Sequence, residues 1–225
     1  MEEEKLDNPV WNSLNETHKN FSLELNGFKF YKPEYCPFGG FTKLEHPISD
    51  LEEQLTFTDN FYIVGENPQF SSKLTLVKNL VCNQMILKQP INIELNEQIV
   101  ELKTDKQKIE LFDLVNLVQP GYFNRKTVDL GRYFGIYKNE QLVAATGERM
   151  KMNCFTEVSA VVTHPEHTGK GYAKQLIKQT TNQIFNGNKT PYLHVAAFNI
   201  GAIKLYEKLG FTYRRQISFW NFTTS

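Results

Sequence analysis

The chain has 225 residues, of which 40 % are hydrophobic and 22 % charged, a composition typical of a soluble globular protein with a sizeable core. Its formal net charge is zero, so no overall field would attract nucleic acid or an anionic membrane. The start, Met1–Lys5, is too acidic for a signal peptide, and no apolar run is as long as a membrane span. Cys36, Cys82 and Cys154 lack metal-ligand spacing, which predicts free thiols, no bound metal and a cytoplasmic location.

The first 90 residues predict short elements and contain no catalytic constellation. Asp7-Asn8-Pro9 is typical of a helix start. Apolar residues alternate on both sides of Asn26-Gly27, which predicts a hairpin between residues 21 and 30. The prolines and glycines from Pro33 to Gly40 predict a loop. Strands are expected at 61–64 and 75–86.

The second half has a more regular alternation of strands and helices. A helix capped by Thr104 or Asp105 is expected to carry Ile109, Phe112, Leu114, Val115 and Val118 on its apolar face. Further helices are expected at 124–131, 172–186 and 199–209, and strands at 99–102, 133–137, 142–150, 155–163, 191–197, 211–213 and 217–222. The order β-α-α-β-β-β-α-β-α-β-β predicts an α/β layer domain on a mixed sheet.

Predicted strands and helices alternate more regularly after Pro90, which predicts a domain boundary there. We expect residues 1–90 to form an extra N-terminal α/β subdomain and residues 91–225 to form the main domain. The role of the first part stays open between a degenerate copy of the main fold and a lid that supplies part of an acceptor pocket.

The stretch from Thr168 to Ala173 is the main functional candidate. It reads Thr-Gly-Lys-Gly-Tyr-Ala and lies between a predicted strand and a predicted helix. Gly169 and Gly171 allow the backbone to approach a ligand, and the first N–H groups of a helix have no intrahelical partner, so the turn predicts an anion site. The alternative is an ordinary strand-to-helix turn. The spacing fits neither a Rossmann fingerprint nor a P-loop.

A second motif, Leu205-Tyr206-Glu207-Lys208-Leu209-Gly210-Phe211, follows one strand later. Together with this element order, the two motifs resemble the GCN5-related N-acetyltransferase (GNAT) superfamily, and the string from Glu157 to Ala173 is most similar to its FR47-like branch. The resemblance covers roughly residues 98 to 222. It implies a mixed, mostly antiparallel sheet flanked by helices, and acetyl-CoA as co-substrate.

The family binds the coenzyme A pyrophosphate through the backbone amides of a Gln/Arg-x-x-Gly-x-Gly/Ala turn. Gly171 and Ala173 match this pattern, whereas Thr168 departs from Gln or Arg, which is expected to weaken the site without abolishing it. The resemblance therefore assigns coenzyme contacts to Thr168, Gly169, Lys170, Gly171, Tyr172 and Ala173. For Lys170, a phosphate contact and a solvated surface position are both open.

In the family, the strand before this turn splays from the next strand and its free backbone pairs with pantetheine. By position, the pairing falls to Val161, Val162 and Thr163, with 192–197 as the splayed partner. Pro191, at the start of that partner, is consistent with interrupted pairing.

The second motif implies that Asn199 lies beside the coenzyme and that Tyr206 is the general acid. A phenol with an ordinary pKa near 10 can protonate a departing thiolate at neutral pH. The alternatives are a helix N-cap for Asn199 and a core aromatic for Tyr206.

Glu157 is placed like the general-base glutamate of the histone-acetylating members of the family. A carboxylate that faces a partly apolar cleft is expected to have a raised pKa and to act through water. A substrate-binding or structural carboxylate is the alternative, and Glu148 on the preceding strand is the rival base. For His164, His167 and His194, loop-capping, exposed or core roles are expected rather than catalysis.

The resemblance implies an N-acyltransferase of the GNAT type that moves an acetyl group directly from acetyl-CoA to a primary amine of a small molecule or peptide, in a ternary complex. A longer acyl donor, as in the similar glycine N-acyltransferase-like group, and a catalytically silent acyl-CoA-binding module are the alternatives. No nucleic-acid or membrane partner is expected, and the chain is expected to be a monomer or a homodimer.

Overall fold

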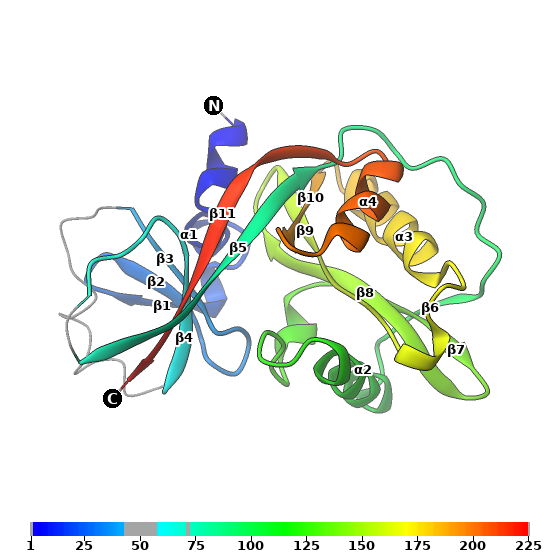
Figure 1. The fold of residues 1–225 in the computed structure, drawn as a ribbon, viewed down its shortest axis with the longest axis horizontal. Coiled ribbons are helices and arrows are strands. Elements are labelled where there is room, and N and C mark those ends of the chain that lie inside the picture. The colour runs from blue at the N-terminus through cyan, green and yellow to red at the C-terminus, as the bar shows by residue number, and fades with distance from the viewer. Residues whose placement is uncertain (1, 43–57, 71–72, 225) are drawn as a thin grey trace.

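The computed structural model describes residues 2–42, 58–70 and 73–224 (Figure 1). The helices are η1 (Glu2–Asp7), α1 (Pro9–Asn15), η2 (Lys19–Phe21), α2 (Asp105–Val118), η4 (Thr127–Leu130), η5 (Pro165–His167), α3 (Tyr172–Asn186) and α4 (Ile200–Lys208). The strands are β1 (Ser22–Leu25), β2 (Phe28–Tyr31), β3 (Phe38–Phe41), β4 (Asn60–Gly65), β5 (Leu74–Ile86), β6 (Ile99–Glu101), β7 (Tyr133–Lys138), β8 (Gln141–Lys151), β9 (Phe155–Thr163), β10 (Thr190–Ala196) and β11 (Thr212–Thr224).

These strands form one 11-stranded sheet in the order β1-β2-β3-β4-β11-β5-β10-β9-β8-β7-β6. Within the described residues, β3–β4 and β9–β10 are the parallel neighbours and the other pairs are antiparallel. The structure thus confirms the predicted mixed, mostly antiparallel sheet with flanking helices.

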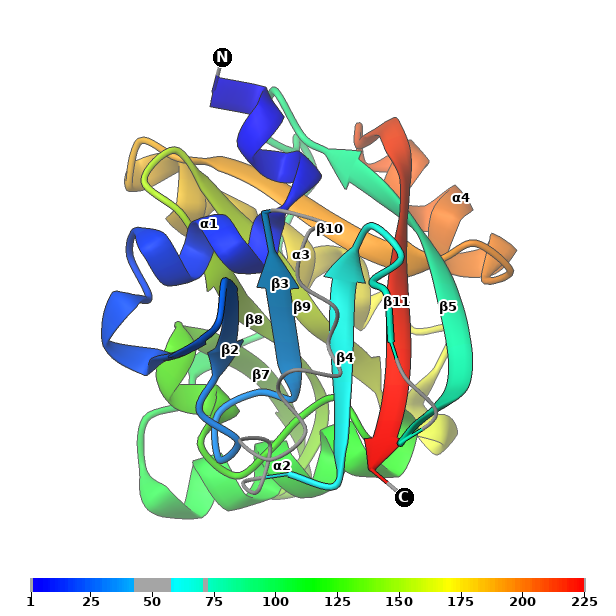
Figure 2. The ribbon, with the colours of Figure 1, turned by 90° about the vertical axis from the view of Figure 1, so that its left-hand side faces the viewer.

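The long strands β5 and β11 join the two ends of the molecule. β11 pairs with β4 through residues 218–223 and with β5 through residues 212–224. Figure 1 shows both strands spanning the molecule between the β1–β4 end and α4, and Figure 2 shows β11 next to β4 with β5 on its other side. Because β5 lies between β10 and β11, the sheet continues across the boundary predicted at Pro90, and the division there stays a prediction.

Helices α2 and α3 pack on opposite faces of the sheet. On β7, Tyr133 belongs to an apolar cluster with Leu114 of α2, whereas its neighbour Phe134 belongs to a cluster with Leu176 of α3. Successive strand residues point to opposite faces, so this alternation assigns one helix to each side. In the described part of the chain, no helix is both long and apolar enough to cross a membrane.

The predicted hairpin is confirmed as β1–β2. Asn26 and Gly27 have φ of 42° and 84°, the left-handed pair that a tight turn between twisted strands requires.

The loop predicted from Pro33 to Gly40 is wrong at its end, where Phe38–Phe41 form β3. A Cβ on Gly39 would lie 2.5 Å from the Phe30 ring, so glycine here permits close packing inside the sheet.

The helix predicted after Thr104 is confirmed as α2, with Thr104 and Gln107 forming a capping box. Its apolar face is only partly as predicted. Leu114 and Val115 are buried, but Ile109 is 55 % exposed and Leu111 is fully buried in its place.

Candidate active site

Strands β9 and β10 separate after a short paired segment. Their parallel pairing covers Phe155–Glu157 on β9 and Thr190–Tyr192 on β10. Beyond Tyr192, β10 continues to pair with β5, while β9 keeps its pairing with β8. The second half of β9 therefore has one edge without a strand partner in the described sheet. Pro191 lies inside the paired segment, so it does not cause the interruption.

A β-bulge lies on the open half of β9. Gly147 of β8 pairs with Ser159 and Ala145 pairs with Val162, so Ala160 and Val161 together lie opposite one residue. Ala160 has φ of 51°, a left-handed conformation that is rare for a residue with a Cβ. Bulges of this kind re-aim the backbone, and here the bulged residues line a cavity.

This cavity, called the main cavity below, has a volume of about 620 Å³. Along β9 it extends from Glu157 to Val161, a distance of about 13 Å at the usual rise of a strand. Ala173 of α3, Tyr206 of α4 and Asn199, the N-cap of α4, also line it. The main cavity thus runs beside the open edge of β9 and reaches both helices that follow it.

The turn before α3 has the conformation expected of an anion site. Gly169 and Gly171 both have φ of 76°, and a Cβ on Gly169 would meet nothing within 4 Å. Gly171 is the N-cap of α3 and its cap position makes no side-chain hydrogen bond, so the first helical N–H groups remain available to a ligand. The Thr168 hydroxyl donates to the Pro165 carbonyl at 3.2 Å, and Lys170 is exposed.

Helix α4 places the other two predicted residues at the main cavity. The Asn199 side chain accepts a hydrogen bond from the Ala202 N–H at 3.1 Å, so it caps the helix. The Tyr206 ring packs edge-on against Phe211 and is 6 % exposed. Burial raises the pKa of the Tyr206 hydroxyl, which keeps it protonated at neutral pH. No described residue forms a hydrogen bond with this hydroxyl.

A buried ion pair, Arg149–Glu157, also lines the main cavity. Arg149 Nε donates to Glu157 Oε2 at 2.8 Å and Nη2 donates to Oε1 at 3.0 Å. His194 Nδ1 lies 2.9 Å from Glu157 Oε1 and its Nε2 lies 3.0 Å from Gln84 Nε2. Since the Gln84 amide nitrogen donates, the imidazole proton lies on Nδ1 and points to Glu157. The carboxylate is thus held by two side chains.

The raised pKa expected for Glu157 is wrong. Burial alone would raise the pKa of this carboxyl, but Arg149 and then His194 lower it to about 2. A carboxylate with so low a pKa is a poor proton acceptor. The sequence could not show this outcome, because Arg149 and His194 reach Glu157 from two different strands.

Glu148, His164 and His167 lie outside the described lining of the main cavity. Glu148 is buried and its Oε2 accepts from Lys151 Nζ at 2.7 Å. His164 accepts from the Glu166 N–H at 3.3 Å and His167 contacts Lys170, as expected for loop residues. None of the three lies where an amine in the main cavity could reach it.

The structure brings together Glu157, Val161, Ala173, Asn199 and Tyr206 around the main cavity. The side chains of Val162 and Tyr172 instead pack in apolar clusters, so a coenzyme contact there would use the backbone.

The sequence interpretation missed two groups that line the main cavity: Arg149, and the aromatic residues Phe38, Tyr122 and Phe219. A charged residue inside the apolar run of β8 was the available signal for Arg149.

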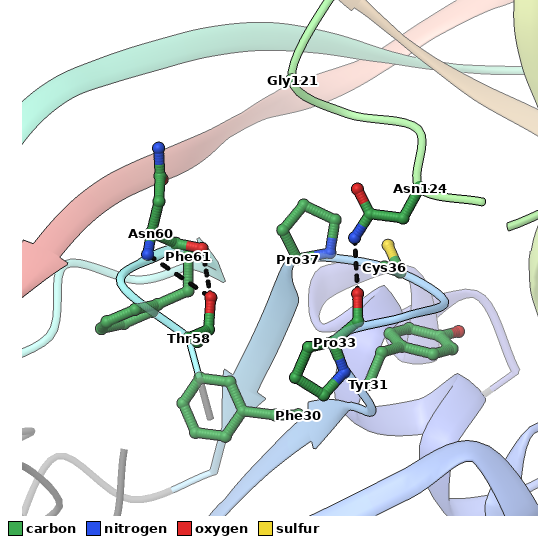
Figure 3. A pocket seen from close by; sticks show the side chains of 10 residues that line it. All are labelled: Phe30, Tyr31, Pro33, Cys36, Pro37, Thr58, Asn60, Phe61, Gly121 and Asn124. Atoms are coloured by element: carbon green, nitrogen blue, oxygen red, sulfur yellow. Dashed lines mark hydrogen bonds between the residues drawn. The ribbon is translucent and has the colours of Figure 1, made fainter. Parts of the chain in front are cut away.

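A second cavity of about 250 Å³ lies between the Pro33–Pro37 segment and the Gly121–Asn124 segment (Figure 3). The Asn124 amide donates to the Pro33 carbonyl across it. Cys36 lines it, but burial raises the pKa of this thiol to about 12, which keeps it unreactive. Its described lining contains no helix N-terminus and no charged side chain for a coenzyme.

Comparison with known proteins agrees with this geometry. Residues 133–220 match the family model of FR47-like proteins. A GNAT-family protein from Novosphingobium aromaticivorans has a similar structure, with a TM-score of 0.88, 29 % sequence identity and coverage of 98 % of each chain. A GCN5-related N-acetyltransferase-like protein from Streptococcus suis has a TM-score of 0.65 at 14 % identity over 96 % of this chain and 92 % of that one, so it shows the fold alone.

One curated relative also matches in sequence. Spermidine N(1)-acetyltransferase of Vibrio cholerae is 44 % identical over 54 residues, which span 23 % of this chain and 31 % of the relative. The match thus covers less than a third of that protein. The family model, the near-complete structural match, the splayed strands and the glycine turn agree with one another, and the chain belongs to the GCN5-related N-acetyltransferase superfamily, with an FR47-like domain at residues 133–220.

Proposed function

We propose that this protein is an acetyl-CoA-dependent N-acetyltransferase that moves the acetyl group directly to a primary amine of a small molecule or peptide. The observation that carries the proposal is the main cavity, which brings the open edge of β9, Ala173 in the first turn of α3, Tyr206 and the Arg149–Glu157 pair into one space. Both substrates can meet in such a space, so no covalent acetyl-enzyme is needed.

The coenzyme would lie along the open edge of β9. The backbone N–H groups of the Thr168–Ala173 turn would hold the pyrophosphate, helped by the α3 dipole. Val161, Val162 and Thr163 would pair through their backbone with pantetheine, and Asn199 would lie beside it. The bulge at Ala160 favours this arrangement, because it redirects backbone groups towards the cavity at the place where a thioester carbonyl needs a hydrogen-bond donor.

The transfer of the acetyl group needs one general acid, which protonates the departing thiolate. The amine nitrogen forms a bond to the acetyl carbon, the carbon–sulfur bond breaks, and the Tyr206 hydroxyl gives its proton to the thiolate. The proton that the nitrogen releases passes to water and restores the phenol. We assign the uptake of this proton to water rather than to Glu157, because Arg149 and His194 hold Glu157 in its charged form. Glu157 then serves to fix these two side chains.

The thiols fit the same proposal. Cys36, Cys82 and Cys154 are all free, which suits the cytoplasmic location that we propose. Burial raises the pKa of Cys82, which lines the main cavity, to about 12, so this thiol is a poor nucleophile for a covalent route.

Calorimetry with acetyl-CoA, followed by a thiol-release assay over a panel of amines, tests the proposal. We expect saturable binding of acetyl-CoA and release of coenzyme A that depends on an amine. Binding without release on any amine would instead support an acyl-CoA-binding module, and tighter binding of longer acyl-CoA esters would identify a longer donor.

A further inference from the structure

The Arg149 guanidinium presents an unused hydrogen-bonding edge to the main cavity. A guanidinium has five N–H groups, and two of them donate to Glu157, one from Nε and one from Nη2. Among the described residues, none accepts from Nη1. The Arg149 side chain is 11 % exposed and lines the main cavity, and its Nη1 is not among the fully buried atoms of the described residues that lack a hydrogen-bond partner, so the free edge is accessible.

The unused edge is held in a fixed orientation. The Arg149 guanidinium carbon lies 4.7 Å from the centroid of the Phe38 ring, and Glu157 holds the adjacent Nε–Nη2 edge of the guanidinium. Glu157 is in turn fixed by His194 and by the Met150 N–H at 3.4 Å. A planar fork held in this way is pre-organised for a second carboxylate, which it can bind through two parallel hydrogen bonds.

The charges around this region favour an anion over a second cation. Glu157 and Arg149 are the charged residues among the described lining of the main cavity, and both oxygens of Glu157 already accept from Arg149. No carboxylate of this lining is left for an additional ammonium group. Lys78 adds positive charge nearby, since its Nζ lies 3.2 Å from the hydroxyl of Tyr122 in the cavity wall.

We propose that the acceptor amine also carries a carboxylate, and that the Nη1–Nη2 edge of Arg149 binds it. The inference rests on the proposed function and narrows its substrate class. Phe38 stacks on the guanidinium, and Phe219, which packs against Phe38, and Tyr122 line the same cavity, so these rings would contact the apolar part of such an acceptor. A polyamine, which carries only ammonium groups, lacks the group that Arg149 would recognise.

The test compares acceptors with and without a carboxylate, and each amino acid is matched by its own amide. Thiol release from acetyl-CoA is measured with the standard amino acids, with their amides and with spermidine. We expect the best amino acid to have a kcat/KM roughly 10- to 100-fold above that of its amide, which is the usual scale for a charge-assisted bidentate contact. An amide or spermidine that matches or exceeds every amino acid would overturn the inference.

Arg149→Lys provides the second arm. Lysine keeps the charge beside Glu157 but has no planar fork. We expect KM for the amino acid to rise roughly tenfold or more, with KM for the amide and the acetyl-CoA affinity nearly unchanged. Arg132→Lys, in an exposed pair with Glu101 outside the main cavity, is the matched control. An equal rise in KM for the amino acid and for its amide would show that Arg149 supports the fold and does not bind the carboxylate.

Failure of the inference is distinct from failure of the proposed function. Transfer to amines without a carboxylate keeps the acetyltransferase and removes only the role of Arg149. If no amine releases thiol, calorimetry of the amino acids in the presence of coenzyme A still decides the inference, because binding that Arg149→Lys weakens supports it and absence of binding refutes it.

Discussion

At the scale of single residues, the Tyr206 hydroxyl is the most informative group. No described residue forms a hydrogen bond with it, so Tyr206→Phe removes one oxygen and no such bond. We expect the free energy of unfolding to change by less than about 1 kcal/mol. If the hydroxyl protonates the thiolate, kcat should fall on the order of a hundredfold.

The control for this variant is coenzyme affinity. Acetyl-CoA affinity measured by calorimetry should stay the same, because the loss is confined to the transition state. Near-normal kcat in the phenylalanine form would show that Tyr206 is a core aromatic and that the thiolate takes its proton elsewhere.

Predictability from sequence differs sharply between residues of one site. Tyr206 and Asn199 lie on one short helix, so their positions follow from a local motif and the structure places both at the main cavity. The environment of Glu157 depends on Arg149 from β8 and His194 from β10, and this non-local pairing reverses the expected direction of its pKa shift. The residues next to Glu157 in the sequence do not indicate such a contact.

At the scale of elements, the turn that begins α3 can be tested by charge. Gly171→Asp places a carboxylate at the helix N-terminus, where it competes with the coenzyme phosphates. We expect the dissociation constant of acetyl-CoA to rise roughly 10- to 100-fold, which corresponds to one close like-charge contact near a protein surface.

Gly171→Asn is the matched control. Asparagine has nearly the same shape and also tolerates the φ of 76° at this position, and its Cβ would meet only the flexible end of Lys174. The comparison therefore isolates charge from backbone strain. Equal affinities in the two variants would refute the phosphate site.

Among the elements, those with a strong local signal were predicted and those that depend on packing were not. The hairpin at Asn26-Gly27 and the capping box of α2 have sequence signatures that the structure confirms. Strand β3 contains Gly39 and Gly40, which favour a loop by composition, but Gly39 is required in the strand because the Phe30 ring occupies the space that a Cβ at 39 would need. No sequence window contains that information.

At the scale of the whole molecule, one buried histidine connects the two halves of the chain. His18 Nε2 donates to the Leu130 carbonyl at 3.0 Å, and its Nδ1 accepts from the Tyr31 hydroxyl at 2.8 Å. Burial lowers the pKa of His18 to about 4. The neutral ring therefore suits the folded protein, and its protonation opposes folding.

The lowered pKa of His18 makes the stability of the fold depend on pH over a defined range. The unfolded histidine, with an ordinary pKa near 6.5, binds a proton before the folded one does, so stability is complete above pH 6.5 and falls towards pH 4. The loss is on the order of 2 to 3 kcal/mol. Glu157, with its pKa lowered to about 2, adds a separate loss between about pH 4.5 and 2.

His18→Gln tests this link, with denaturant unfolding measured at several pH values between 7 and 4. The variant should be less stable at pH 7, because glutamine cannot reproduce both hydrogen bonds, and its stability should decline less towards pH 4 than that of the wild type. Parallel pH dependences in the two proteins would mean that other groups set the acid sensitivity.

The central claim is that acetyl-CoA and the amine meet in one cavity and react directly. Initial rates of thiol release, measured while both concentrations are varied, test it most directly. A ternary complex predicts double-reciprocal lines that intersect, with an N-acetylated amine formed in equal amount to coenzyme A. Parallel lines, which indicate a covalent acetyl-enzyme, or coenzyme A release that does not depend on the amine, would contradict it.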